Sequence, residues 1–567
     1  MDQPCRNASA VALPLEARPF HPGPAGLGVR AALAAVMLCC ALLVALAAQA
    51  QPALPMAGFF GGGFGAPGRF TYTQIELEEE GQTLKGRIYQ PYHRTDSPPI
   101  QNLRRRGLRI DFEAASLAFE LERSDTGYRG TVRDPAGASH PAWFAIRPGS
   151  PPATLLARFE GSYDLGEGRL LTLSRNNDGG GFWYVELPSG RTGFLFNLSD
   201  TEFLAGPCLY CAGPERMRLR FAPGDGDAPV ASVAVRLEGS ERTAPRVGGY
   251  REERVAFVSR DGTRLAGTLF LPEGARRHPA MVLVHGSGGQ TRNGFYGHIR
   301  FLAEAYARAG IAALAYDKRG TGESEGDWER AGLALLADDA AAALRYLAGR
   351  PDIRASRLGL SGASQAGWIV PMAASRFPGV RILQIRVGSS PMGVEESERR
   401  RLVRQMQADG FAAADIERAM RIRMLMDEYA RTGRDWERLE AAAAPVAEEY
   451  WMRQYIGGLP SRDSPDWAWL REAFAYDVRA DFARSRARLQ ILYGGSDALI
   501  DPAVAIPLVR AALAGGRARE VEIEVVPGAT HHGLEGSTGG EREFPGLSRF
   551  VPGHFDRIVG WAAQRLR

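Results

Sequence analysis

The stretch RLGLSGASQAGW, residues 357–368, decides the fold. A short apolar run ends at Ser364, which stands between small residues, and this pattern predicts a buried strand that turns sharply into a helix. Gly362 lets the backbone bend beneath the serine, while Ala366 and Gly367 are small enough to keep the helix from colliding with the strand. We therefore predict that Ser364 lies exposed at the tip of a strained turn, where its hydroxyl can act as a nucleophile.

Continuous apolar runs alternate with helical patterns from residue 250 to the C-terminus. Runs of this kind are typical of parallel strands that helices cover on both faces. We predict a doubly wound, mostly parallel α/β sheet over residues 250–567. The runs are MVLVHG, IAALAYD, RLGLSG, ILQIRVGS, LQILYGG and VEIEVVPG.

One helix-rich interval, at about residues 394–486, interrupts this alternation. It falls between two predicted strands, so it would lie above the carboxyl ends of the sheet, where open sheets of this kind bind ligands. We interpret it as a helical lid. Its large side chains could line an apolar pocket or pack the core of the lid itself; they are Tyr450, Trp451, Met452, Tyr455, Trp467 and Trp469.

Residues 69–246 show short runs of alternating apolar and polar residues, separated by glycine, asparagine and aspartate. A period of two with turn residues between the runs indicates an antiparallel all-β region. Two modules are plausible, 69–150 and 153–246. The region offers no convergent histidine, acid and nucleophile, so we expect a structural or substrate-selecting role.

The N-terminus has the pattern of a signal peptide. Residues 31–47 form an unbroken apolar run that follows Arg30 and precedes a small-x-small motif, so we predict a signal peptide over residues 1–50 with cleavage after Ala50. An uncleaved anchor is the alternative, and translation starting near Val29 would shorten the long leading segment. Residues 51–68 are rich in proline, glycine and phenylalanine and are predicted to be a flexible linker.

Export has a consequence for the cysteines, because only Cys208 and Cys211 follow the predicted cleavage site. In an oxidising compartment, such as the periplasm or the exterior of the cell, this pair is most simply a local disulfide. A redox-active pair would need a thioredoxin-like context, and a zinc site would need two more ligands nearby.

The charge of the chain does not point to nucleic acid. The 567 residues include 69 lysines plus arginines and 65 aspartates plus glutamates, which gives a formal charge of +4. The basic residues are scattered rather than gathered in a block, so we expect no nucleic-acid partner.

Further motifs stand in the order that a serine nucleophile requires. HGSGG, residues 285–289, is a glycine-rich turn whose backbone N–H groups suit an oxyanion hole. Asp497 follows the strand LQILY, and His531 and His532 follow the strand VEIEVV. Each candidate comes after a strand end, so we predict that Ser364, Asp497 and His531 converge above one edge of the sheet.

The residue types fit nucleophilic catalysis. A serine hydroxyl attacks poorly unless a neighbouring base takes its proton, and histidine, oriented by a carboxylate, is suited to that role. Within the acidic pair, Asp501 precedes Pro502 and is better placed to cap a helix, so we favour Asp497. His532 remains the second choice for the base. We expect His285 to order the glycine-rich turn, and Asp317 with Arg319 to brace the next loop.

Residues from about 250 to the C-terminus resemble the α/β-hydrolase superfamily through VLVHGSGG, YDKRGTGES, GASQAG, GGSD and PGATHHG. The combination is similar to exported esterase and acyl-peptidase-like members. This resemblance implies that the backbone N–H groups of Ser287 and Gln365 form the oxyanion hole. Ala366 departs from the glycine that many members have, but alanine is also small. No metal or organic cofactor is implied.

The sequence therefore predicts a serine hydrolase that cleaves an ester or thioester through an acyl-enzyme. Two alternatives stay open: a peptidase acting on short peptides, and an envelope ligand-binding protein on a catalytically idle scaffold. The expected partner is a small acyl substrate or a short peptide. We expect no stable membrane span once the signal peptide is removed.

Overall fold

The computed structural model describes residues 55–566 except 82, 177–180, 225, 275–276 and 390. The predicted signal peptide lies outside the described residues, as do the first residues of the predicted linker. Within the described residues, no helix combines the length and the apolar character needed to cross a membrane.

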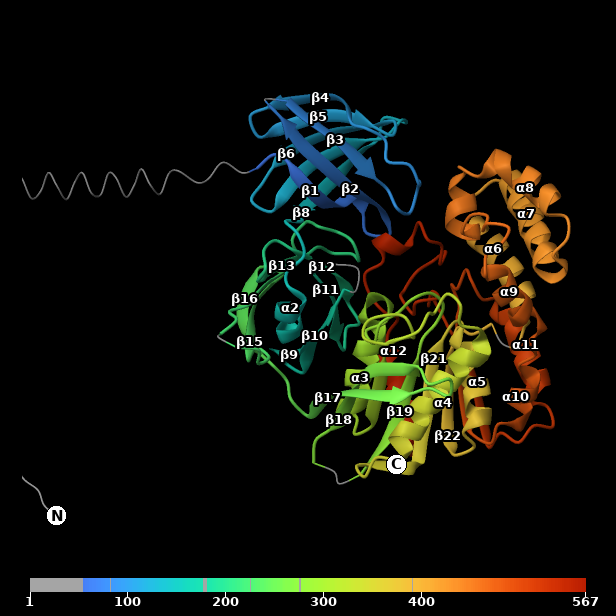
Figure 1. Ribbon diagram of the computed structural model, residues 1–567. Coiled ribbons are helices and arrows are strands. Elements are labelled where there is room, and N and C mark those ends of the chain that lie inside the picture. The colour runs from blue at the N-terminus through green and yellow to red at the C-terminus, as the bar shows by residue number, and fades with distance from the viewer. Residues whose placement is uncertain are drawn as a thin grey trace, which may run out of the picture. The chain divides into compact units, whose positions relative to one another are not determined.

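The first β-region is one antiparallel eight-stranded sheet in the order β3-β2-β1-β8-β7-β6-β5-β4, in which β1 pairs with β8 and β3 and β4 are the edge strands. Two backbone hydrogen bonds join β3 to the segment before β4, so the sheet is barrel-like (Figure 1). They run from the N–H of Ile88 to the carbonyl of Pro98 and from the N–H of Ile100 to the carbonyl of Gly86. Its strands are β1 (Gly58–Ala66), β2 (Arg69–Glu80), β3 (Thr83–Tyr89), β4 (Gln101–Arg106), β5 (Arg109–Ala114), β6 (Leu117–Arg123), β7 (Gly127–Arg133) and β8 (Ser139–Ile146).

The predicted flexible linker is wrong for residues 58–66, which form β1. Phe60 and Phe64 point into the core of the first sheet, at the period of two that a strand requires. The glycines between them permit close strand packing, since a Cβ on Gly62 would lie 2.1 Å from the carbonyl oxygen of Trp143. The glycine-rich composition thus reflects tight packing of strands in this segment.

The second β-region is another antiparallel eight-stranded sheet in sequential order. A hydrogen bond from Val247, just after the last strand, to the carbonyl of Ser162 in the first strand brings the two ends of the sheet together. Helix α2 (Ala153–Phe159) contributes Leu156 and Phe159 to the core of this region. Its strands are β9 (Gly161–Gly166), β10 (Arg169–Arg175), β11 (Phe182–Leu187), β12 (Thr192–Asn197), β13 (Glu202–Ala205), β14 (Met217–Arg220), β15 (Ser232–Leu237) and β16 (Ser240–Pro245).

Cys208 and Cys211 form a disulfide in the loop between β13 and β14. The N–H of Leu209, inside this small loop, donates to the carbonyl of Leu547 at 2.7 Å. The disulfide loop therefore packs against a segment near the C-terminus of the chain.

The third sheet has eight strands in the order β17-β18-β20-β19-β21-β22-β23-β24. It is mixed, because β17 and β18 run antiparallel whereas β19 to β24 run parallel to one another. The strands are β17 (Tyr250–Val258), β18 (Arg264–Pro272), β19 (His278–Val284), β20 (Ala312–Tyr316), β21 (Ile353–Ala363), β22 (Val380–Arg386), β23 (Arg488–Gly494) and β24 (Glu520–Val526).

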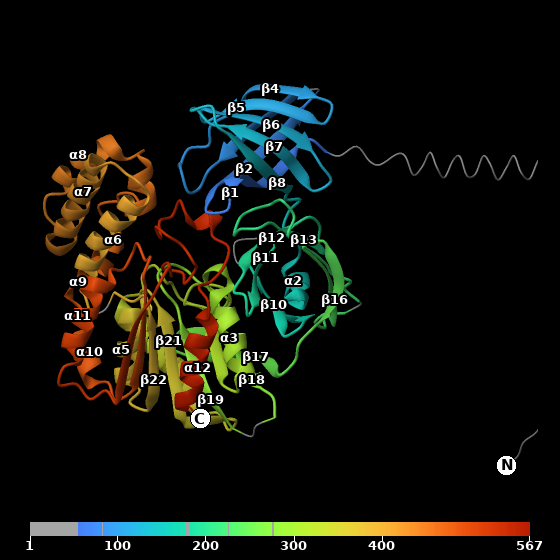
Figure 2. The same cartoon turned by 180° about the vertical axis from the view of Figure 1, so that it is seen from behind.

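Helices cover both faces of this sheet, which explains its continuous apolar strands. In β19, for example, Val282 belongs to the core beneath α4 and α5, whereas Met281 and Leu283 belong to the core beneath α3 and α12. Figure 2 shows α3 and α12 lying against the sheet. The helices are α3 (His298–Arg308), α4 (Leu333–Ala348), α5 (Ala366–Arg376), α10 (Arg479–Arg484), α11 (Pro502–Leu513) and α12 (His554–Leu566).

Between β22 and β23 the chain forms a helical insertion with a separate apolar core that includes Trp451, Met452, Tyr455 and Trp467. These side chains pack the insertion itself. The following helix, α10, packs against α5 and α11 beside the sheet. The insertion helices are α6 (Val394–Ala408), α7 (Ala413–Thr432), α8 (Trp436–Ala443) and α9 (Asp466–Ala475).

A buried ionic cluster connects the second β-region to α3. Glu304 is fully buried and lies 3.0 Å from Arg300 and 3.2 Å from Arg308, and it accepts a hydrogen bond from the hydroxyl of Ser162 at 2.6 Å. Burial alone would raise the pKa of Glu304, but the two arginines hold it below its usual range.

We expect Glu304→Ala to destabilise the protein by about 3–5 kcal/mol, because it removes a buried carboxylate that two arginines share. Arg308 loses its ion-pair partner and Arg300 keeps only Glu252 close by. Calorimetry would show this as a melting transition lowered by several degrees. Glu120→Ala is the control: Glu120 is exposed and lies 3.5 Å from Arg133, so its loss should cost less than about 1 kcal/mol. Equal effects of the two substitutions would contradict the structural role of Glu304.

Candidate active site

Ser364 occupies the turn between β21 and α5 with a φ of 58°, in the left-handed region that serine rarely adopts. Its N–H donates to the carbonyl of Arg386 at 2.9 Å, which fixes the turn to the end of the neighbouring strand β22. A Cβ added to Gly362 would lie 2.4 Å from the Cβ of Ala366, so the crossing of strand and helix leaves room only for glycine. The backbone thus has the strained strand-to-helix geometry that the sequence predicted.

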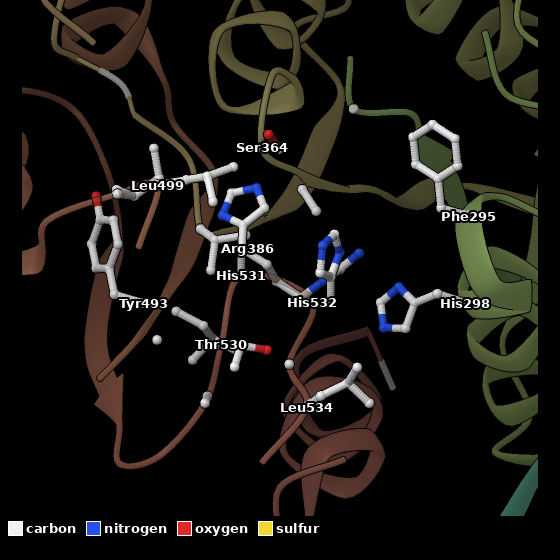
Figure 3. A pocket seen from close by; sticks show the side chains of 18 of the residues that line it. Phe295, His298, Ser364, Arg386, Tyr493, Leu499, Thr530, His531, His532 and Leu534 are labelled. Atoms are coloured by element: carbon white, nitrogen blue, oxygen red, sulfur yellow. The ribbon is translucent and has the colours of Figure 1, made fainter. Parts of the chain in front are cut away.

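Asp497 and His531 are hydrogen-bonded to each other. His531 Nδ1 lies 2.9 Å from Asp497 Oδ2, and both side chains are almost completely buried. The other carboxylate oxygen accepts the N–H groups of Leu499 at 2.7 Å and Ile500 at 3.0 Å. With Nδ1–H donating to the carboxylate, Nε2 retains its lone pair, and Figure 3 shows the His531 ring turned toward Ser364.

His532 has a different environment, although it also lines the cavity. Its ring packs edge-on against Tyr296 and Phe544, with centroids 5.2 and 5.0 Å away. Burial, together with the neighbouring His531, lowers the pKa of His532 to about 3, which keeps the ring neutral. Of the two candidate histidines, the structure pairs His531 with Asp497.

Asp501, the alternative acid, caps α11 by accepting the N–H of Ala503 at 2.9 Å. Asp317 and Arg319 were expected to brace the neighbouring loop, and each forms a buried ion pair. Asp317 pairs with Arg292, and Arg319 pairs with Asp339 at 2.6 Å.

Ser287 and Gln365 line the same cavity as Ser364, and a buried lysine holds the segments that contain them. Lys318 Nζ donates to the carbonyl oxygens of Gly286 at 2.9 Å and Gly288 at 3.0 Å, and to Oε1 of Gln365 at 3.2 Å. The Gly286 carbonyl and the Ser287 N–H belong to one planar trans peptide and point in opposite directions. By binding this carbonyl, Lys318 fixes the direction of the Ser287 N–H.

Sequence reasoning missed Lys318, although a signal was present. The chain has two lysines, Lys85 and Lys318, among its 69 basic residues. A single lysine within a long arginine-rich region marks a position where a compact ammonium is needed, because three acceptors converge on one nitrogen. Burial lowers the pKa of Lys318 to about 8, and the charge of Asp339 partly opposes this shift.

Ser364 and His531 line a cavity of about 490 Å³, whereas the Asp497 side chain is fully buried behind His531. Besides the third sheet, the insertion contributes Ser397 and Glu398 to its lining, and the second β-region contributes Thr192 and Leu209. Figure 3 shows the part of the cavity that surrounds His531. A space of this size accommodates a small organic substrate.

The insertion is anchored to the loops that carry the acid and the histidine. Arg404 donates to the carbonyl of Asp497 at 2.6 Å. At the end of α6, the Asp409 carboxylate accepts the Tyr455 hydroxyl at 2.6 Å and the N–H groups of Glu541 and Arg542 at 3.0 and 2.9 Å. The helices therefore contact the site directly.

The family model of the X-Pro dipeptidyl-peptidases (S15 family) matches residues 261–500, the region from β18 to the Asp497 loop. The match supports the predicted α/β-hydrolase character of this part of the chain. This confirms the resemblance seen in the sequence. The match covers less than half of this chain and does not include His531.

Curated relatives match a shorter part. An uncharacterized 31.7 kDa protein of Escherichia coli is 33% identical over 119 residues, which is 21% of this chain and 40% of the relative. A thiohydrolase of Aspergillus aculeatus is 32% identical over 130 residues, 23% of this chain and 39% of the relative. The chain thus spans less than half the length of the curated relatives it matches.

Two solved structures are similar to part of this chain. A hypothetical protein from Pseudomonas aeruginosa is 19% identical, with a TM-score of 0.36 and coverage of 56% of this chain and 95% of that chain. An esterase from Pyrococcus furiosus is 16% identical, with a TM-score of 0.37 and coverage of 57% and 96%.

Proposed function

We propose that the protein is a serine hydrolase that cleaves esters or thioesters through an acyl-enzyme. One observation carries the proposal: His531, hydrogen-bonded to Asp497, lines the same cavity as Ser364 at its strained turn. A nucleophile, a base and a group that orients the base are the elements that this chemistry requires.

In the proposed mechanism, Nε2 of His531 takes the proton from Ser364 while the serine oxygen attacks the carbonyl carbon of the substrate. Asp497 holds the imidazole in the productive tautomer and stabilises the imidazolium. The imidazolium then protonates the leaving group as the bond to it breaks. A water molecule, deprotonated by the same histidine, releases the acid from the acyl-enzyme.

The N–H groups of Ser287 and Gln365 are the proposed donors to the oxyanion of the tetrahedral intermediate. Preorganised donors of this kind stabilise charge that develops only during the reaction. Lys318 acts as a positioning residue for both, because it binds the carbonyl before Ser287 and the side chain of Gln365.

The helical insertion is proposed to be the lid of the cavity. Its contacts with the carbonyl of Asp497 and the backbone of Glu541 support this role, since they join α6 to the loops on which catalysis would depend. The disulfide between Cys208 and Cys211 supports export to the periplasm or the exterior of the cell, where disulfides persist.

A peptidase is the second candidate, and the S15 family model favours it. Esters, thioesters and amides can all be cleaved through the same acyl-enzyme mechanism, so the site alone does not rank them. The name of the thiohydrolase relative favours a thioester. Parallel turnover of a 4-nitrophenyl ester, an acyl thioester and an X-Pro 4-nitroanilide would rank the three. The anilide as the best substrate would overturn the ester proposal while leaving the serine hydrolase intact.

We expect a fluorophosphonate probe to label the wild-type protein at Ser364 and to leave Ser364→Ala unlabelled. Intact-mass spectrometry and peptide mapping would identify the modified residue. Ser375→Ala is the control, because Ser375 lies on α5 and bonds to Asp481 at 2.6 Å. An unlabelled wild-type protein would exclude the serine hydrolase and leave the binding-protein alternative.

We expect His531→Ala to lower kcat for a short-chain ester by at least about 1,000-fold, since it removes the base. His532→Ala is the matched variant of the adjacent residue and should retain far more activity, because Asp497 is bonded to the other ring. Steady-state kinetics of the two proteins decide the assignment. Loss confined to His532→Ala would show that the base has been assigned wrongly.

We expect Lys318→Met to lower kcat by about 10-fold to 100-fold with little change in KM, because the oxyanion donors lose their orientation. The wild-type profile should also show a decline as pH rises through about 8, where Lys318 loses its proton and with it one donated hydrogen bond. This alkaline decline should be absent from Lys318→Met. Lys85→Met, an exposed control, should keep both kcat and the decline. An unchanged profile in Lys318→Met would contradict the role.

A further inference from the structure

Arg386 is a buried cation beside the nucleophile that the proposed mechanism does not use. It ends β22, where its carbonyl accepts the N–H of Ser364 at 2.9 Å. Its side chain is 8% exposed and lines the cavity that contains Ser364 and His531. The guanidinium is therefore enclosed by protein but accessible to a molecule in the cavity.

Arg386 lacks a carboxylate partner among the described residues. The interaction that the structure gives its side chain is a hydrogen bond from Nη1 to the hydroxyl of Ser361 at 2.6 Å. Three arginines that are buried as deeply have carboxylates within 3.0 Å: Arg300, Arg319 and Arg423. An uncompensated buried charge is costly, so an anion that enters the cavity would be strongly favoured at this position.

The surroundings of Arg386 are also suited to an anion. His298 and His554 are the first residues of α3 and α12, so two helix N-termini approach this part of the cavity. The Nε2 atoms of the two histidine rings lie 3.0 Å apart. Burial and the charge of Arg386 hold the pKa of His298 well below its usual range and lower that of His554 to about 3. Both imidazoles are thus neutral polar groups, and Arg386 carries the charge.

Two acidic residues also line the cavity, and each of them has a partner of its own. Glu398 on α6 pairs with Arg401 at 2.9 Å, and Glu541 accepts from Gln405 at 3.3 Å. Neither of them pairs with Arg386. Figure 3 shows Arg386, His532 and His298 near His531, which identifies the cationic part of the cavity as close to the reacting groups.

We propose that Arg386, flanked by His298 and His554, binds a carboxylate of the substrate, so that the enzyme acts on esters whose acyl group or leaving group is anionic. This inference rests on the proposed serine hydrolase function and specifies its substrate class. The carboxylate would accept hydrogen bonds from the guanidinium, the geometry in which arginine binds carboxylates most strongly.

Two substrate pairs separate the acyl side from the leaving-group side. The first pair places the carboxylate on the acyl side: mono-4-nitrophenyl adipate is compared with the 4-nitrophenyl ester of adipic acid monoamide. The second pair places it on the leaving group: 3-acetoxybenzoate is compared with 3-acetoxybenzamide. We expect kcat/KM to favour the carboxylate member of one pair by at least about 10-fold, the effect of a charge-assisted hydrogen bond. Arg386→Met should lower this preference by about 10-fold to 100-fold.

Arg401→Lys is the matched control, because Arg401 lines the same cavity and pairs with Glu398, and lysine keeps the positive charge beside that carboxylate. The carboxylate preference of this variant should stay within about threefold of wild type, since the charge of the cavity is unchanged. A second measurement needs no variant: adipate monoamide should protect wild-type Ser364 from the fluorophosphonate at lower concentration than adipamide does. The monoamide keeps one carboxylate, whereas the diamide has none.

The outcomes are separable. A protein that is labelled and hydrolyses the neutral esters, but shows no carboxylate preference in either pair and equal protection by the two amides, contradicts the Arg386 subsite alone. A preference that survives Arg386→Met also contradicts it. A protein that is neither labelled nor active contradicts the proposed function itself.

Discussion

The candidate site depends on the strained backbone of Ser364. A φ of 58° for serine costs on the order of 1–3 kcal/mol and persists only when the surrounding structure enforces it. Two contacts do so: the hydrogen bond from Ser364 to the carbonyl of Arg386, and the close approach of Gly362 to Ala366. The same turn places Gln365 at the start of α5, so the nucleophile and one proposed oxyanion donor are fixed together.

Two buried cations flank this turn and serve different ends. The ammonium of Lys318 binds two backbone carbonyls and one side-chain oxygen, so its role is internal and its acceptors all belong to the protein. The guanidinium of Arg386 has a serine hydroxyl as its acceptor and faces the cavity. Lysine suits convergence on one point, whereas arginine suits a planar anion, and the chain uses each accordingly.

Much of this arrangement could be predicted from the sequence, because short-range patterns encode it. Small residues around Ser364 specified the turn, and the apolar runs that end at Asp497 and His531 specified which side chains meet at one edge of the sheet. The choice between His531 and His532 could not be decided by pattern, since it depends on which ring the chain directs toward Asp497.

Features set by long-range packing were hidden from the sequence. The glycine-rich composition of residues 58–66 predicts a linker, yet β1 needs these glycines because neighbouring strands approach too closely for side chains. Arg386 was hidden for a related reason. An arginine at the end of an apolar strand is usually solvated beyond the sheet. Only the packing of α12 against β22, together with the hydrogen bond from Tyr306 of α3 to Gln384 of β22, shows that it is enclosed. Since it lies beside a strained serine and lacks a carboxylate partner in the described part of the chain, the favourable partner for its charge is an anion in the cavity.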